Sequence, residues 1–309
     1  IFVKRNQFQK AIKYLEKTIE VQPKIYNAHL NLGVIYKDLG KLEKAKHFTN
    51  NAIELNPKFA EAYNNLGGIL KDMGELKEAE VSTREAIKIK PDYIEAHNNL
   101  GSILIDLNKL DEAEISTKKA IEFDPNYAEC YNNLGIIFKK KCRLIEAKES
   151  ILKSIKLKPN AAQSYLNLGN ILTDLGMLNQ AEESVEKAIM LKPDYAEAYC
   201  SLGYIMKHLN KLKEAEKLTL KAIEINPSIE IAHNNLATIF QELGKLDEAE
   251  KSVRKALELK KDYADANCNL GKILIDKGNL KEAEIYISKA IINDPKSAKG
   301  YYIMSHLNP

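Results

Sequence analysis

Hydrophobic and polar positions alternate along this chain in a pattern that repeats every 34 residues. When the chain is cut into repeats starting at Tyr26, the third, seventh, tenth and fourteenth places are largely apolar. Spacings of three and four residues place these positions on one side of a helix. A second such set, between the seventeenth and twenty-eighth places, predicts a second helix. Each repeat is therefore expected to be a helix–turn–helix hairpin.

Prolines mark the end of each repeat. Pro23 is followed at the same 34-residue spacing by six further prolines, and the series resumes at Pro295 after Lys261. Because Ile1 enters the pattern partway through, we expect the chain to be a piece of a longer protein. The pattern predicts one array over 1–309, with partial repeats at 1–25 and 298–309 and full repeats at 26–59, 60–93, 94–127, 128–161, 162–195, 196–229, 230–263 and 264–297.

Small residues in fixed columns predict where the helices meet. The eighth place is Gly in seven repeats and Ala237 in the other, and the twentieth place is always Ala. Such places let two helices approach closely. The fifteenth place is Gly or Asn, which tolerate the left-handed conformation after a helix. Cys142 breaks this rule, and we expect a strained or altered turn there.

Polar residues ahead of the first helix predict how that helix begins. Asp92 is followed three residues later by Glu95, a spacing typical of a capping box. The same spacing recurs in the next three repeats, at Asn126/Glu129, Asn160/Gln163 and Asp194/Glu197.

These columns resemble the tetratricopeptide repeat signature, in which an aromatic residue, Leu-Gly, Ala and Pro stand at fixed offsets. The resemblance covers essentially the whole chain, although His29, His97, His233 and Asn267 replace the aromatic residue in four repeats. It implies an all-α fold: an α-solenoid in which antiparallel helix pairs stack into a right-handed superhelix. It also implies that the first helices line a concave groove and that the protein binds other polypeptides.

Composition supports an interaction protein over an enzyme. Acidic and basic residues nearly balance, giving a net charge of +3, and only four of the 46 basic residues are Arg, which argues against nucleic acid. No apolar stretch reaches the length of a membrane span, and no nucleophile, phosphate-loop or metal motif is present. The four cysteines suit a reducing compartment. We therefore expect a cytoplasmic, non-catalytic segment without a cofactor or a metal.

The sixth place of the first helix holds Asn in seven of eight repeats, interrupted by Ser201. Asn is a poor residue inside a helix, so the column needs a reason. An amide can bind the backbone of an extended peptide, and a similar Asn ladder runs along the repeat domain of the O-linked N-acetylglucosamine transferases. Alternatively, the amides bond between repeats and set the superhelical pitch. The column consists of Asn31, Asn65, Asn99, Asn133, Asn167, Asn235 and Asn269.

Acidic residues at the thirteenth place flank this column. A carboxylate in the last turn opposes the helix dipole, so a role in binding or pairing with lysines at the twelfth place is expected. We include Asp38, Asp72, Asp106 and Asp174 in the candidate peptide-binding site.

Three functions follow from this surface. The first is a protein-interaction scaffold that binds an extended, polar or basic peptide. The second is the substrate-recognition arm of a larger transferase whose catalytic domain lies beyond residue 309. The third is a self-assembly or spacer module acting end to end or through its convex face. The sequence leaves the partner, the biological process and the oligomeric state open.

Overall fold

The computed structural model describes residues 2–305 and 307, and every regular element in this part is an α-helix. Ile1, His306, Asn308 and Pro309, which the repeat assignment places in the two partial repeats, lie outside the described residues. The chain divides into two compact units, here called the N-terminal unit, up to Pro159, and the C-terminal unit, from Asn160. The prediction of a single array over 1–309 therefore stays a prediction.

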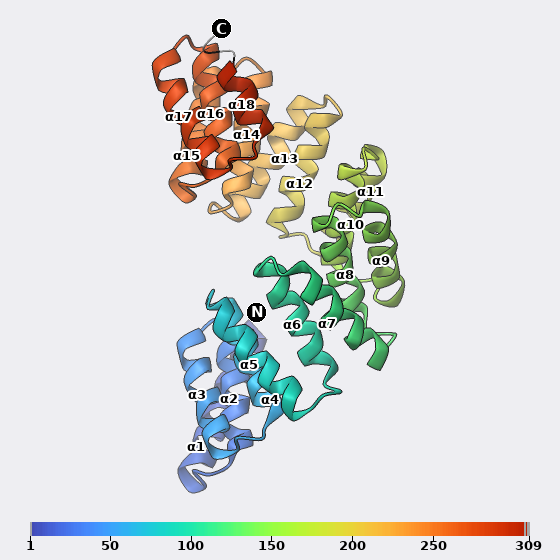
Figure 1. Cartoon of the computed structure of the whole chain (residues 1–309). Helices are drawn as coiled ribbons and strands as arrows, with labels where there is room; N and C mark the ends of the chain where they lie inside the picture. The colour runs from blue at the N-terminus through green and yellow to red at the C-terminus, as the bar shows by residue number, and fades with distance from the viewer. Residues whose placement is uncertain (1, 306, 308–309) are drawn as a thin grey trace. The chain divides into compact units, whose positions relative to one another are not determined.

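The N-terminal unit holds nine helices of the described chain (Figure 1). They are α1 (Phe2–Val21), α2 (Tyr26–Asp38), α3 (Leu42–Leu55), α4 (Ala60–Asp72), α5 (Leu76–Ile89), α6 (Ile94–Asp106), α7 (Leu110–Phe123), α8 (Ala128–Lys140) and α9 (Leu144–Leu157). The C-terminal unit holds the other nine. They are α10 (Ala162–Asp174), α11 (Leu178–Leu191), α12 (Ala196–His208), α13 (Leu212–Ile225), α14 (Glu230–Glu242), α15 (Leu246–Leu259), α16 (Ala264–Asp276), α17 (Leu280–Asn293) and α18 (Ala298–Ser305).

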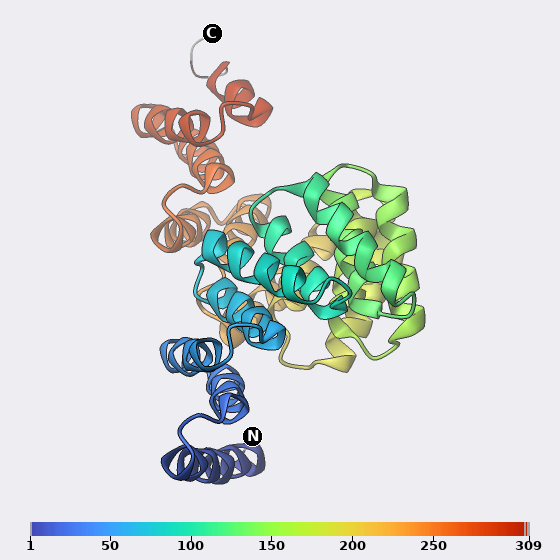
Figure 2. The same cartoon turned by 60° about the horizontal axis from the view of Figure 1, so that its bottom comes forward.

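Within each unit the helices pack in chain order. Each first helix, such as α4, packs against the second helix of its own repeat, against the preceding second helix and against the first helix of the next repeat. The turned view shows the N-terminal pairs one above another (Figure 2). The predicted all-α solenoid of stacked helix pairs is confirmed, and each repeat buries its apolar faces against its neighbours.

The invariant columns form the core. Leu32, Ile69, Ile103 and Leu270 are fully buried, as are the twentieth-place alanines. Close approach at the eighth place is also confirmed. A Cβ atom added at Gly67 would lie 3.2 Å from the carbonyl oxygen of Ala79 on the facing helix. The small residue is thus required by backbone contact as well as by side-chain contact.

The turn at Cys142 has the same shape as its equivalents. Cys142 has a φ of 59°, against 58° at Asn108 and 60° at Asn210. Its amide donates to the carbonyl of Lys139 at 2.9 Å, and the amide of Arg143 donates to Phe138 at 2.8 Å, as in the other repeats. The prediction of an altered turn is therefore wrong. The left-handed residue is nonetheless confirmed, and it carries the strain of a Cβ atom in that region.

The predicted capping boxes are wrong by one residue. The N-cap of α6 is Tyr93, in an extended conformation and without a side-chain cap hydrogen bond. The helix begins at the first place of the repeat, so Asp92 precedes the cap. In α8, α10 and α12 the N-cap is likewise the residue after the predicted one, namely Tyr127, Ala161 and Tyr195.

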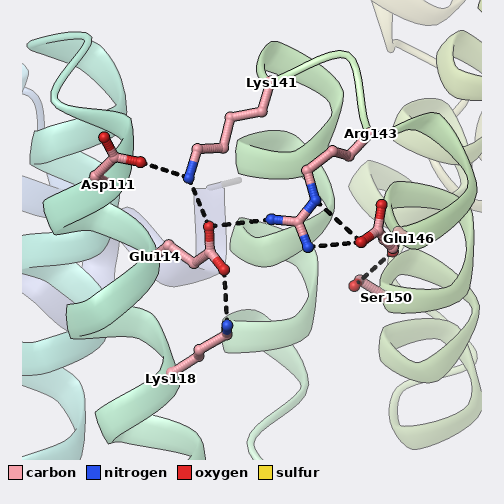
Figure 3. Close-up of polar contacts among 7 residues, drawn as sticks. All are labelled: Asp111, Glu114, Lys118, Lys141, Arg143, Glu146 and Ser150. Carbon is pink, nitrogen blue, oxygen red and sulfur yellow. Dashed lines mark hydrogen bonds and ion pairs between the residues drawn. The ribbon is translucent and has the colours of Figure 1, made fainter.

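Ion pairs join successive second helices. Glu114 of α7 accepts hydrogen bonds from Lys118 at 2.7 Å, from Lys141 at 2.7 Å and from Arg143 at 3.4 Å (Figure 3). Lys141 and Arg143 lie in the turn before α9, so the cluster connects the repeat at 94–127 with the repeat at 128–161. Glu250 plays the same part in the C-terminal unit, 2.7 Å from Lys277.

Candidate functional site

The Asn column forms hydrogen bonds between adjacent repeats. In three repeats the sixth-place amide donates to the side chain at the fifth place of the preceding repeat, 35 residues earlier. These bonds are Asn99 to Asn64 (2.9 Å), Asn133 to Asn98 (2.9 Å) and Asn269 to Asn234 (2.8 Å). Their acceptors are buried or half-buried, so each bond satisfies a polar group that has little access to water.

Buried tyrosines extend this network. The phenol of Tyr93 forms a hydrogen bond with Asn64, and that of Tyr263 forms one with Asn234. Burial raises the pKa of both phenols to about 12 despite these bonds, so both are neutral at physiological pH. The resulting chains, from tyrosine through the fifth-place Asn to the sixth-place Asn, give part of the column a structural role.

Two members of the column, Asn31 and Asn65, are available for further contacts among the described residues. Asn31 is exposed and Asn65 is half-buried, and in the described part of the chain neither side chain has a hydrogen-bond partner. The reason is local, because the fifth-place residue before Asn65 is Leu30, which offers no acceptor. Within the described part of the chain, the Asn235 side chain donates only to the sulfur of Cys200, at 3.5 Å, and sulfur is a weak acceptor. Asn167 accepts a hydrogen bond from Gln163 at 3.2 Å.

The thirteenth-place acids are largely paired with lysines of the preceding repeat. The pairs are Lys37 with Asp72 (3.4 Å), Lys71 with Asp106 (3.3 Å) and Lys207 with Glu242 (3.2 Å). Asp174 also takes part in an interaction. Asp38 is exposed and has no ion-pair partner among the residues described. Pairing therefore cancels much of the negative charge that the sequence assigned to this face.

A hollow of about 450 Å³ opens on the first helices of the C-terminal unit. Four successive first helices, α12, α14, α16 and α18, supply its walls. Their side chains are Lys207 from α12, Thr238, Gln241 and Glu242 from α14, Asn269, Lys272 and Asp276 from α16, and Lys299 from α18. Every residue that lines the hollow thus has a polar or charged side chain, and one of them belongs to the Asn column.

Sequence reasoning missed an aromatic pair on the same face. Tyr204 and His208 of α12 have ring centroids 4.4 Å apart, and Tyr204 is 40% exposed. Burial, followed by the charges of Asp174 and Asp265, raises the pKa of the phenol. Burial and Lys207 lower the pKa of His208. The sequence does carry a signal, since Tyr204 is the one aromatic residue in the ninth-place column of the full repeats.

The histidines of the aromatic column are structural. His29, His97 and His233 each lie within 3.1 Å, through Nε2, of the carbonyl oxygen of the proline six residues earlier. Three of the four cysteines are buried, and burial raises the pKa of Cys130 and Cys200 to about 12. Among the described residues no group of His, Cys, Asp and Glu could hold a metal ion, and no helix is long and apolar enough to cross a membrane.

Comparison with known proteins supports the repeat assignment. A family model described as the cilia and flagella-associated protein 70 C-terminal domain matches residues 1–190. Two tetratricopeptide repeat models match residues 196–229 and 234–298. A search of curated proteins gives no significant match.

Solved structures share the fold at low sequence identity. The APC/C hetero-tetramer Cut9–Hcn1 is similar with a TM-score of 0.74 and 16% identity, over 99% of this chain and 60% of that chain. A tetratricopeptide repeat protein from Parabacteroides merdae is similar with a TM-score of 0.65 and 18% identity, over 81% of this chain and 99% of that chain. This chain thus spans about 60% of the first of these relatives.

Proposed function

Because the chain belongs to the tetratricopeptide repeat family, with residues 1–190 in the family of the cilia and flagella-associated protein 70 C-terminal domain, we propose that it binds an extended polypeptide segment along the polar face of its first helices. This makes it an interaction scaffold that recognises a partner chain mainly through the partner's backbone.

The observation that carries the proposal is the hollow on the first helices of the C-terminal unit. Its polar lining comes from four successive repeats, so a ligand that filled it would have to be elongated in the stacking direction. An extended chain advances about 3.3 Å per residue and presents a donor or an acceptor at each step. Amide, hydroxyl and charged groups repeated along the helices suit such a ligand.

In the N-terminal unit we assign the contacts with the peptide backbone to Asn31 and Asn65, the members of the Asn column that have no side-chain partner among the described residues. Asn31 and Asn65 keep both amide hydrogens and the carbonyl oxygen available. Each hydrogen bond to a peptide backbone contributes about 0.5–1.5 kcal/mol. Asn99 and Asn133 already form hydrogen bonds with the preceding repeat. They can offer a bound peptide only the amide hydrogen and the oxygen lone pairs that these bonds leave unused.

The test is a selection of displayed peptides on the full chain, followed by fluorescence anisotropy with the selected peptides. The double substitution Asn31→Ala and Asn65→Ala is expected to weaken binding roughly tenfold, since it removes two amide groups, each with two N–H donors and one acceptor oxygen. The control is Asn50→Ala, which makes the same chemical change on the second helix α3. Selection of no peptide, or equal affinity in the double variant, would count against the proposal.

A further inference from the structure

The hollow of the C-terminal unit carries more positive than negative charge. Three lysines line it against two carboxylates. Lys207 lies 3.2 Å from Glu242, so these two charges cancel. The remaining carboxylate, Asp276, accepts a hydrogen bond of 2.5 Å from the neutral amide of Gln241. Lys272 and Lys299 therefore face one carboxylate between them.

The two remaining lysines lack a carboxylate partner of their own. Lys272 is exposed, and in the described chain its ammonium group has no hydrogen bond or ion pair. Lys299 donates to the side-chain oxygen Oδ1 of Asn269 at 2.7 Å, which holds the ammonium group against the wall without neutralising it. An ammonium group has three donors, so both lysines can still donate to a ligand.

We propose that this hollow accepts an anionic group, a carboxylate side chain or a phosphate ester, carried by the bound segment and contacted by Lys272 and Lys299. The proposal rests on the proposed function, because the anion is placed on a peptide lying along the first helices. It reverses the sequence-based expectation of a basic partner for this part of the face. A compact ammonium charge attracts both kinds of anion, and a phosphate, with the larger charge, is expected to bind more tightly.

Asp276 allows the anion site to be tested by a substitution that should strengthen binding. It lies four residues after Lys272 on the same face of the helix, so its negative charge opposes an anion that approaches the ammonium group. Its conversion to an uncharged amide would raise anion affinity, whereas loss of a merely structural carboxylate would leave affinity unchanged.

The first experiment titrates the full chain with inorganic phosphate and, separately, with acetate at low salt, followed by backbone amide chemical shifts. Saturating shifts at Asn269, Lys272 and Lys299 are expected. The double variant K272Q/K299Q should weaken phosphate binding roughly tenfold, and D276N should strengthen it roughly threefold, in line with charge-assisted hydrogen bonds at an exposed site. The matched control is K213Q/K217Q on the second helix α13, which makes the same change in net charge.

Equal titration of the wild type, K272Q/K299Q and D276N would overturn the proposal, as would shifts of the same size at the lysines of α13. The second experiment uses a display-selected peptide resynthesised with Glu, phosphoserine, Gln or Lys at one position in turn. The Glu and phosphoserine peptides are expected to bind more tightly than the Gln and Lys peptides, and this advantage should disappear in K272Q/K299Q. Comparison of the Glu peptide with the phosphoserine peptide shows which of the two anions the site prefers. Peptides that bind regardless of charge would overturn the anionic site while leaving the scaffold intact. Saturation by phosphate without any peptide binding would support the site and count against the scaffold.

Discussion

At the residue scale, the Asn column contains two kinds of member, bonded and unbonded among the described residues, that the residue type alone could not separate. Asn99 and Asn65 occupy the same place in successive repeats, yet Asn99 bonds to Asn64, whereas the Asn65 side chain has no partner among the described residues. The difference lies in the fifth-place residue of the preceding repeat, which is Asn64 in one case and Leu30 in the other. The likeness to the ladder of O-linked N-acetylglucosamine transferases stays a prediction, because part of this column is engaged within the fold.

Asn99→Ala is expected to lower the free energy of unfolding by about 1–2 kcal/mol, because it removes a donor to the buried side chain of Asn64. Asn65→Ala should change stability by no more than about 0.5 kcal/mol, since it breaks no hydrogen bond and Ala favours the helix. Urea unfolding followed by circular dichroism measures both. Equal losses in the two variants would show that the column has one role throughout.

Cys142→Gly is expected to stabilise the protein by about 0.5–1 kcal/mol, because Gly accepts a φ of 59° without the steric cost of a Cβ atom. Asn108→Gly, at the same place one repeat earlier, should stabilise the protein by only about a few tenths of a kcal/mol, since Asn tolerates this conformation better. Thermal unfolding of both variants measures the difference. A gain at Asn108 as large as that at Cys142 would contradict the interpretation of strain.

How much the sequence could predict is clearest from its columns. Leu32 and its equivalents recur without exception, so the core and the helix pairs were predictable from periodicity. For the Asn column, the sequence left peptide binding and bonding between repeats as two alternatives. It could not decide between them because the fifth place, which supplies the acceptor, is not one residue type but varies between Leu30, Asn64 and Cys200. Charge cancellation within the hollow depends on the rotation from one repeat to the next, which periodicity does not give.

At the element scale, two adjacent glycines of α4 have opposite roles. A Cβ atom at Gly67 would collide with the hydroxyl oxygen of Thr83 and would lie 3.2 Å from the carbonyl oxygen of Ala79. A Cβ atom at Gly68 would meet only the flexible end of Lys37. One glycine faces the partner helix and the other faces the polar surface.

Gly67→Ala is therefore expected to destabilise the protein by about 1–3 kcal/mol through overpacking. Gly68→Ala should stabilise it by about 0.5–1 kcal/mol through helix propensity, because the Lys37 side chain can move aside. Chemical denaturation of the two single variants measures both signs. Destabilisation by Gly68→Ala of the same size would show that helix–helix distance is not what selects glycine at Gly67.

At the scale of the whole molecule, ion-pair clusters between repeats make stability depend on pH. Burial alone would raise the pKa of Glu114, but hydrogen bonds from Lys118 and Lys141 lower it to about 2. A carboxyl group with a lower pKa in the folded chain stabilises the fold above its unfolded pKa, and this stabilisation is lost as the pH falls through the folded value. The same direction holds for Glu250 in the C-terminal unit.

Unfolding free energy is accordingly expected to fall between about pH 5 and pH 2, with roughly 1–3 kcal/mol of the loss due to Glu114, whose side chain is 12% exposed. The variant Glu114→Gln should lose this contribution at pH 7 and show a shallower decline in acid. The control is Glu149→Gln, an exposed glutamate of α9 without an ion-pair partner among the described residues. Parallel pH profiles for Glu114→Gln and the wild type would contradict the assignment.

The offset of 35 residues in the inter-repeat bonds has a consequence for how such a chain can change in length. Each bond joins the trailing side of one repeat to the leading side of the next, so every repeat carries both halves of the connection. Excision of residues 230–263 would bring Lys207 opposite Asp276, a pair of the same kind as the one it replaces. Excision of residues 94–127 would instead bring Lys71 opposite Lys140, two like charges. Gene duplication and loss can therefore add or remove some blocks of 34 residues freely, while other junctions accept only the neighbour they already have.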